Sequence, residues 1–193
     1  VSKKDEVFNA INSLDENWQT VDVLINNAGN AHGLATFQDA SIDDLEAMID
    51  GNVKGIIYVT KAVLPLMNNG SNKHILNISS IAGKQVYTNG TTYCASKWAV
   101  EALTKGMRLD FLPLEIKVTS IAPGAVETEF SLVRFKGNQE KSDAVYKGYK
   151  ALEAIDIANT IDFVLSQPEH VQLADITLLP KAQADGITIQ RKN

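Results

Sequence analysis

Cysteine is almost absent from this chain, which has only Cys94 among its 193 residues. An internal disulfide is therefore excluded, and the composition indicates a reducing, cytoplasmic setting. A lone helical cysteine is usually a small buried apolar side chain, and we interpret Cys94 in that way rather than as a nucleophile. Metal-ligand spacing is also missing from the three histidines, so we expect a site without metal. We expect His74 and His170 to lie at the surface, while for His32, which follows the Asn-Asn-Ala-Gly turn, a position at the mouth of a site is left open as an alternative.

Long apolar runs and clusters of basic residues are missing too. No stretch approaches the ~18–20 apolar residues that a membrane span needs, and the N-terminal residues 1–6 contain no apolar signal-peptide core. The net charge is −5 and the pI is about 5.2, with no basic cluster denser than Lys3-Lys4. This charge argues against a nucleic acid partner. We therefore expect a soluble protein with a small-molecule substrate and neither a membrane nor a nucleic acid partner.

What remains is the composition of a globular domain, with 45% hydrophobic and 21% charged residues. The length suits one domain over residues 1–193. Apolar residues at helical spacing and short β-branched runs predict the secondary structure. They predict helices over 3–14, 42–67, 91–112 and 153–167, and strands over 21–25, 74–78, 116–121 and 173–179. The second helix is expected to break near Gly51 or Gly55. This alternation predicts an α/β fold with a doubly wound parallel sheet of the Rossmann-like type.

Tyr93 and Lys97 are four residues apart within the predicted helix 91–112. Such residues lie on one helix face, so the ammonium would sit beside the phenol. A neighbouring cation favours the phenolate, and Tyr93 would then exchange protons with a substrate. Taken alone, such a pair is more often a packed tyrosine beside a lysine that extends toward solvent.

Three of the predicted strands end in motifs suited to ligand contact. These motifs are Asn26-Asn27-Ala28-Gly29, Ser79-Ser80 and Pro123-Gly124. Ligands of parallel sheets bind beyond the carboxyl ends of the strands, so we expect the three motifs to converge. Ser80 is interpreted as functional and Ser79 as structural.

Taken together, these motifs resemble the short-chain dehydrogenase/reductase family. The resemblance rests on Asn26-Asn27-Ala28-Gly29, Asn52, Ser80, Tyr93-x-x-x-Lys97 and Pro123-Gly124-Ala-Val-Glu-Thr128, in that order and at the family's spacing. It extends from residue 1 to about residue 180.

The resemblance implies a role for each of these residues. Tyr93 would be the general acid/base, Ser80 would hydrogen-bond the substrate oxygen, and Lys97 would bind ribose hydroxyls and lower the tyrosine pKa. Asn52 would hold a water that relays protons, although its side chain could also bridge an irregularity in its helix. The remaining positions would contact the cofactor. They are Asn27, Ala28 and Gly29 along the adenosine half, Val126 and Thr128 at the nicotinamide carboxamide, and Pro123 and Gly124 beside them.

One part of the family pattern is missing from this sequence. The Gly-rich phosphate loop, Gly-x-x-x-Gly-x-Gly, does not occur, nor does the strand that selects NAD or NADP. The sequence is therefore expected to hold a family domain that lacks its first βα units and is incomplete at the N-terminus.

Within the family, residues 127–137 and Ala182-Gln-Ala resemble the NADP-dependent 3-hydroxy acid dehydrogenases, which oxidise serine, allo-threonine and related acids. This branch implies NADP as cofactor, with NAD not excluded. Because a guanidinium binds carboxylates well, Arg134 is the candidate for binding the substrate acid group.

Two other functions stay open at this point. One is a carbonyl reductase for bulkier ketones, and the other is a non-catalytic module that has lost its nucleotide-binding loop. The wide apolar faces of helices 42–67 and 91–112 further predict a homodimer or homotetramer.

Overall fold

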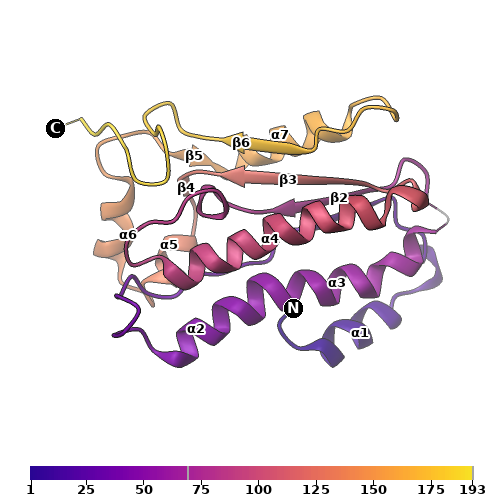
Figure 1. Cartoon of the computed structure of the whole chain (residues 1–193), viewed down its shortest axis with the longest axis horizontal. Helices are drawn as coiled ribbons and strands as arrows, with labels where there is room; N and C mark the ends of the chain where they lie inside the picture. Colours follow the sequence, from indigo (N-terminus) through magenta and orange to yellow (C-terminus); the bar gives the residue numbers. More distant parts are fainter. Residues whose placement is uncertain (69, 193) are drawn as a thin grey trace.

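The structure is built around a parallel β-sheet (Figure 1). It is a computed structural model that describes residues 1–68 and 70–192. The main sheet has the order β1-β2-β3-β6, and all neighbouring strands run parallel. Its strands are β1 (Val23–Asn26), β2 (His74–Ile78), β3 (Lys117–Pro123) and β6 (Asp175–Leu178). The prediction of an α/β fold with a parallel sheet is confirmed.

Helices cover both faces of this sheet because successive strand residues point to opposite sides. Ile75 packs with Val63 and Met67 on the face that carries α1 (Lys4–Asn12), α3 (Gly55–Val63) and α4 (Thr91–Asp110). Its neighbour Leu76 packs with Val164 of α7 (Ala154–Leu165) on the other face. Both side chains are completely buried. Such two-sided burial explains why β2 is an almost unbroken apolar run.

The predicted helix 42–67 is one helical run with a change of winding in its middle. It consists of α2 (Ile42–Ile49), the π turn η2 (Asp50–Lys54), α3 and the 3-10 turn η3 (Leu64–Met67). The π turn contains Gly51 and ends immediately before Gly55, so the predicted break is confirmed. π turns inside helices often occur at functional sites.

Short elements gather at the end of the sheet toward which the strands run (Figure 1). They are β4 (Val126–Glu127) paired with β5 (Leu152–Glu153), and the helices α5 (Phe130–Arg134) and α6 (Gln139–Tyr146). A hydrogen bond of 2.7 Å between Ser131 Oγ and the Tyr146 hydroxyl joins α5 to α6. The 3-10 turns η1 (Glu16–Trp18), η4 (Ile81–Gly83) and η5 (Leu112–Leu114) complete the chain.

The predicted surface position of His74 is wrong. Its side chain is only 1% exposed, and Nε2 lies 2.8 Å from Thr119 Oγ1 on the neighbouring strand. Burial, together with the nearby charge of Lys117, lowers the pKa of His74 to about 4, so the ring is neutral. A polar residue at the start of a strand looked exposed in the sequence, but this strand is central in the sheet. His170 is exposed, as expected.

No helix among residues 1–68 and 70–192 is both long and apolar enough to cross a membrane.

Candidate active site

The carboxyl ends of β1, β2 and β3 border one cavity of about 490 Å³. Nine residues that the sequence placed in the site line it, which confirms that the strand-end motifs converge. They are Asn27, Gly29, Ser80, Tyr93, Lys97, Pro123, Gly124, Val126 and Thr128. Ala28 and Asn52 do not line this cavity.

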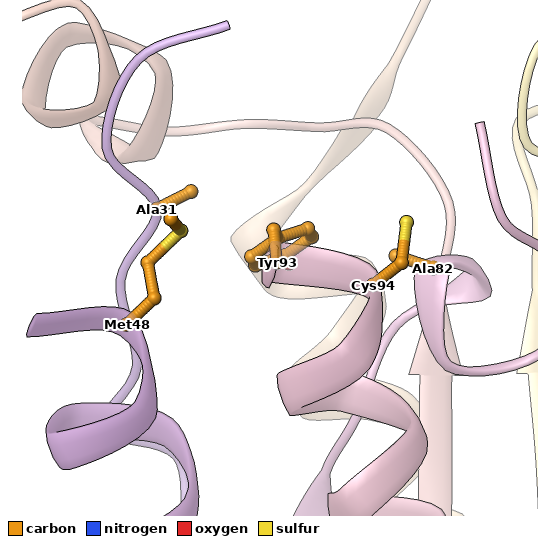
Figure 2. Packing of buried hydrophobic residues seen from close by; sticks show 5 residues of the cluster. All are labelled: Ala31, Met48, Ala82, Tyr93 and Cys94. Atoms are coloured by element: carbon orange, nitrogen blue, oxygen red, sulfur yellow. The ribbon is translucent and has the colours of Figure 1, made fainter. Parts of the chain in front are cut away.

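Tyr93 lies in the first turn of α4, where it is only 7% exposed. It belongs to a buried cluster with Ala31, Met48, Ala82 and Cys94 (Figure 2). Burial raises the pKa of the Tyr93 phenol above its ordinary value, and hydrogen bonding with Ser80 is the largest effect that opposes this shift. Cys94 is fully buried, which confirms its interpretation as an apolar core residue.

Ser80 is held by the short turn that follows β2. Its hydroxyl accepts a hydrogen bond from the backbone N–H of Ala82 at 3.1 Å and so caps the 3-10 turn η4. The adjacent Ser79 hydroxyl is buried at the same cavity and has no hydrogen-bond partner among the described residues.

Lys97 follows Tyr93 by one helical turn, and its Nζ lies 6.0 Å from the centroid of the Tyr93 ring. The ammonium donates a hydrogen bond of 3.0 Å to the carbonyl oxygen of Ile78, at the end of β2. Burial lowers the pKa of Lys97 to about 8, and the charge of Glu101 opposes this shift. An ammonium has three N–H donors, so donors remain for a ligand in the cavity.

Asn52 belongs to the π turn and connects two parts of the site. Its side-chain oxygen accepts from the Asn30 N–H at 2.7 Å, and its amide donates to the Asn30 carbonyl and to Ser96 Oγ, each at 2.9 Å. Ser96 Oγ in turn donates to the Tyr93 carbonyl at 2.7 Å. The side chain therefore does bridge a helix irregularity, as the sequence left open.

Gly29 lies against both Asn52 and Lys97. A Cβ at this position would be 3.0 Å from Asn52 Oδ1 and 3.4 Å from Lys97 Nζ. A side chain here would therefore push on two candidate site residues, which is a physical reason for glycine at the end of the Asn-Asn-Ala-Gly motif.

Arg134 ends α5 and lies near the Tyr93 ring. Its guanidinium carbon is 5.4 Å from the ring centroid, Nε donates to the Gly33 carbonyl at 3.1 Å, and Nη2 lies 3.5 Å from the Tyr87 hydroxyl. A second cavity, of about 220 Å³, is lined by Arg134, Tyr93 and His32 among others. His32 thus lies beside the site, a position that the sequence had left open.

Sequence reasoning missed two groups of residues here. Four residues of α7 line the larger cavity, namely Ala154, Ile157, Ala158 and Ile161, and their apolar helical pattern is that of an ordinary core helix. Tyr87 was also missed, although the Asn89-Gly90 turn that follows was a signal. A Cβ on Gly90 would lie 2.2 Å from an atom of the Tyr87 ring, so glycine makes room for this tyrosine.

The larger cavity fits the nicotinamide end of a dinucleotide. It offers the remaining Lys97 donors to a polar ligand, and apolar walls from α7 to a flat ring. No group of three or more His, Cys, Asp or Glu side chains in the described part of the chain is arranged to hold a metal ion.

Comparison with known proteins agrees with this geometry. A family model described as short chain dehydrogenase matches residues 1–139. The chain is 40% identical over 192 residues to the NADP-dependent 3-hydroxy acid dehydrogenase of Schizosaccharomyces pombe, covering 100% of this chain and 74% of that protein. It is 37% identical to the serine 3-dehydrogenase of Agrobacterium fabrum, covering 100% of this chain and 78% of that protein.

A solved structure is similar as well. It is described as the closed form of serine dehydrogenase complexed with NADP+, and it matches with a TM-score of 0.91 and 37% identity over 99% of this chain and 78% of that one.

Proposed function

Because this chain belongs to the short-chain dehydrogenase family, we propose that it is an oxidoreductase that transfers a hydride between NADP(H) and a small 3-hydroxy acid. The observation that carries the proposal is the meeting of Ser80, Tyr93 and Lys97 at one strand-end cavity. The relatives named for 3-hydroxy acids and serine support the substrate class. Their NADP dependence supports the cofactor.

Named residues would hold the cofactor. Lys97 would bind ribose hydroxyls with the N–H groups that do not reach the Ile78 carbonyl. Val126 and Thr128 would contact the carboxamide, beside Pro123 and Gly124, while Asn27, Ala28 and Gly29 would lie along the adenosine half. When bound, a nicotinamide supplies or accepts the hydride.

The chain's own residues would handle the proton. Tyr93 would take a proton from the substrate hydroxyl during oxidation and return it during reduction. Ser80, which lines the same cavity as Tyr93, would hold the substrate oxygen. Oxidation needs the phenolate form of Tyr93, which burial disfavours. The positive charge of Lys97 would favour the phenolate and so oppose the effect of burial. Asn52 would hold the water that relays protons, as the family resemblance implies. Its hydrogen bond to Ser96 would also fix the position of α4.

Arg134 would bind the substrate carboxylate. Its guanidinium lies beside the proposed proton donor and lines the 220 Å³ cavity. A planar guanidinium matches a carboxylate with two parallel N–H donors.

We further propose that copies of the chain associate as a homodimer or homotetramer in the cytoplasm. Large apolar side chains of α3 and α4 are exposed, including Ile57 at 37%, Trp98 at 48% and Leu109 at 76%. Burial of such side chains against a second copy would be favourable. The single, buried Cys94 suits a reducing compartment.

The test is NADPH formation by the purified protein with serine and other 3-hydroxy acids, alongside the Tyr93→Phe variant. We expect turnover with the acids, and a fall in kcat of roughly 10²-fold or more in the variant, since the proton acceptor is lost. Turnover of bulky ketones alone would favour the carbonyl reductase. Absence of any turnover would favour the non-catalytic module.

A further inference from the structure

Two oppositely charged residues of α4, Lys97 and Glu101, are buried one helical turn apart. Lys97 is 6% exposed and Glu101 is 4% exposed. A buried charge is costly unless an opposite charge or hydrogen bonds compensate it. Glu101 has no part in the proton transfer proposed above, so its burial calls for another explanation.

The surroundings of Glu101 connect it to Lys97. Ser120 of β3 donates a hydrogen bond of 2.8 Å to its carboxylate. Gly83 covers the same part of the helix, because a Cβ there would lie 3.0 Å from Glu101 Cγ and 2.7 Å from the Lys97 carbonyl oxygen. The Lys97 ammonium itself donates to the Ile78 carbonyl. Among the described residues the two charges form no direct ion pair, but their i, i+4 spacing on α4 makes them neighbours in a water-poor interior, where Coulomb forces are weakly screened.

The other charged groups on the elements that pack against α4 are mostly engaged elsewhere. On the same helix, Tyr93 and Cys94 precede Lys97, and Lys105 and Arg108 follow Glu101. Arg108 donates hydrogen bonds to the carbonyl oxygens of Val118 and Ala174. The ion pairs of the neighbouring elements are Asp50 with Lys54 in η2, Asp44 of α2 with Lys136, and Lys84, which follows η4, with Asp175 of β6. On β3, Glu101 meets the neutral Ser120. The one charged residue of this strand, Lys117, lies at its start, three residues before Ser120, and its ammonium is buried without a hydrogen-bond partner among the described residues.

We propose that Glu101 is a positioning residue that acts as the buried counter-ion of Lys97 and keeps its ammonium charged at the cavity. The inference rests on the function proposed above and adds a residue to it. Burial lowers the pKa of Lys97 to about 8, close to physiological pH, and the charge of Glu101 limits that fall. Without the carboxylate, a large fraction of the molecules would carry a neutral lysine, which would no longer favour the phenolate of Tyr93.

The test is a pH titration of the Lys97 side chain by NMR in protein labelled with carbon-13 lysine. The signal is assigned by its loss in Lys97→Arg. In Glu101→Gln we expect the titration midpoint to fall by about one pH unit or more. Glutamine keeps the size of the side chain and an oxygen that accepts from Ser120, and near-UV circular dichroism checks that the variant is folded.

The matched control is Asp110→Asn, which removes one negative charge from an exposed position on the same helix. It should leave the midpoint unchanged, and Glu101→Asp should largely preserve it. An unchanged midpoint in folded Glu101→Gln would overturn the proposal. In the pH profile of kcat/KM, the fall in activity at alkaline pH should shift by as much as the titration midpoint of Lys97 shifts. An inactive wild-type protein would refute the proposed function, while the titration would still decide the role of Glu101.

Discussion

The side chain of Asn52 and the backbone of Asn30 exchange a pair of hydrogen bonds. The Asn30 N–H donates to Oδ1 at 2.7 Å, and Nδ2 donates to the Asn30 carbonyl at 2.9 Å. The same Nδ2 also donates to Ser96 Oγ on α4. One completely buried side chain thus joins the segment that follows β1, the π turn and the helix that carries Tyr93 and Lys97.

Asn52→Ala should destabilise the protein. The substitution removes three hydrogen bonds and leaves buried polar groups without partners, so we expect a loss of about 2–4 kcal/mol. For a chain of this size, that loss lowers Tm by roughly 5–10 °C. Thermal denaturation followed by circular dichroism measures it. Ser96→Ala, which removes only part of this network, should cost less, and an equal loss in both variants would contradict the central position of Asn52.

Gly29→Ala should impair cofactor binding while the fold is kept. The added methyl group would press on Asn52 Oδ1, which must then move by a few tenths of an ångström, and would contact Lys97 Nζ at 3.4 Å. We expect a raised KM for NADP and a lowered kcat. The matched control is Gly106→Ala in α4, where an added Cβ meets nothing within 4 Å. It should leave the kinetics unchanged and stabilise the helix by about 0.5–1 kcal/mol. Identical kinetics in the two variants would argue against the site described here.

Arg134→Met should weaken the binding of 3-hydroxy acids more than the binding of substrates without a carboxylate. If the guanidinium binds the substrate carboxylate, KM for 3-hydroxy acids rises by roughly 10–100-fold, as expected for the loss of a charge-assisted hydrogen-bonded pair. Arg134→Lys should recover only part of this loss, because an ammonium lacks the planar pair of donors. Steady-state kinetics with an alcohol of similar size but without a carboxylate is the control. An equal loss for both substrates would indicate that Arg134 only packs against Tyr93.

His74 should make the folded state sensitive to acid. Its folded pKa is about 4 and its ordinary value is 6.5, so the unfolded chain binds the proton first as the pH falls. The stabilising contribution is therefore complete above pH 6.5 and is lost between pH 6.5 and pH 4, by about 3 kcal/mol. Urea unfolding across this range measures it. His74→Gln should flatten the profile, whereas the exposed His170→Gln should not change it.

Local patterns predicted most of the fold because they act over short stretches of chain. The strand 74–78 was predicted with its observed bounds, and Gly51 and Gly55 marked the π turn. The helices α5 and α6 were not predicted. They span only five and eight residues, too few for a clear helical pattern, and contacts distant in the sequence hold them, such as that between Ser131 and Tyr146.

The functional site was likewise predicted only in part from the sequence. Tyr93, Lys97 and Ser80 have a recognisable spacing, so their meeting at the cavity could be predicted. The α7 residues and Glu101 have no such signal, because an apolar helix face or a helical glutamate has many possible environments. Their importance depends on what the fold places opposite them.

The π turn also sets the rotational register between the two halves of its helix. Each residue of an α-helix turns the chain by roughly 100°, so deleting one residue from 50–54 would straighten the helix and rotate α3 relative to α2. Thr60, which accepts a hydrogen bond of 3.1 Å from Asn26 Nδ2 below the site, would face another direction. Substitutions at the exposed positions of this turn should therefore destabilise the protein far less than a deletion would. The length of the turn keeps Asn52 and Thr60 aligned with the sheet, and the chemistry of its exposed side chains does not.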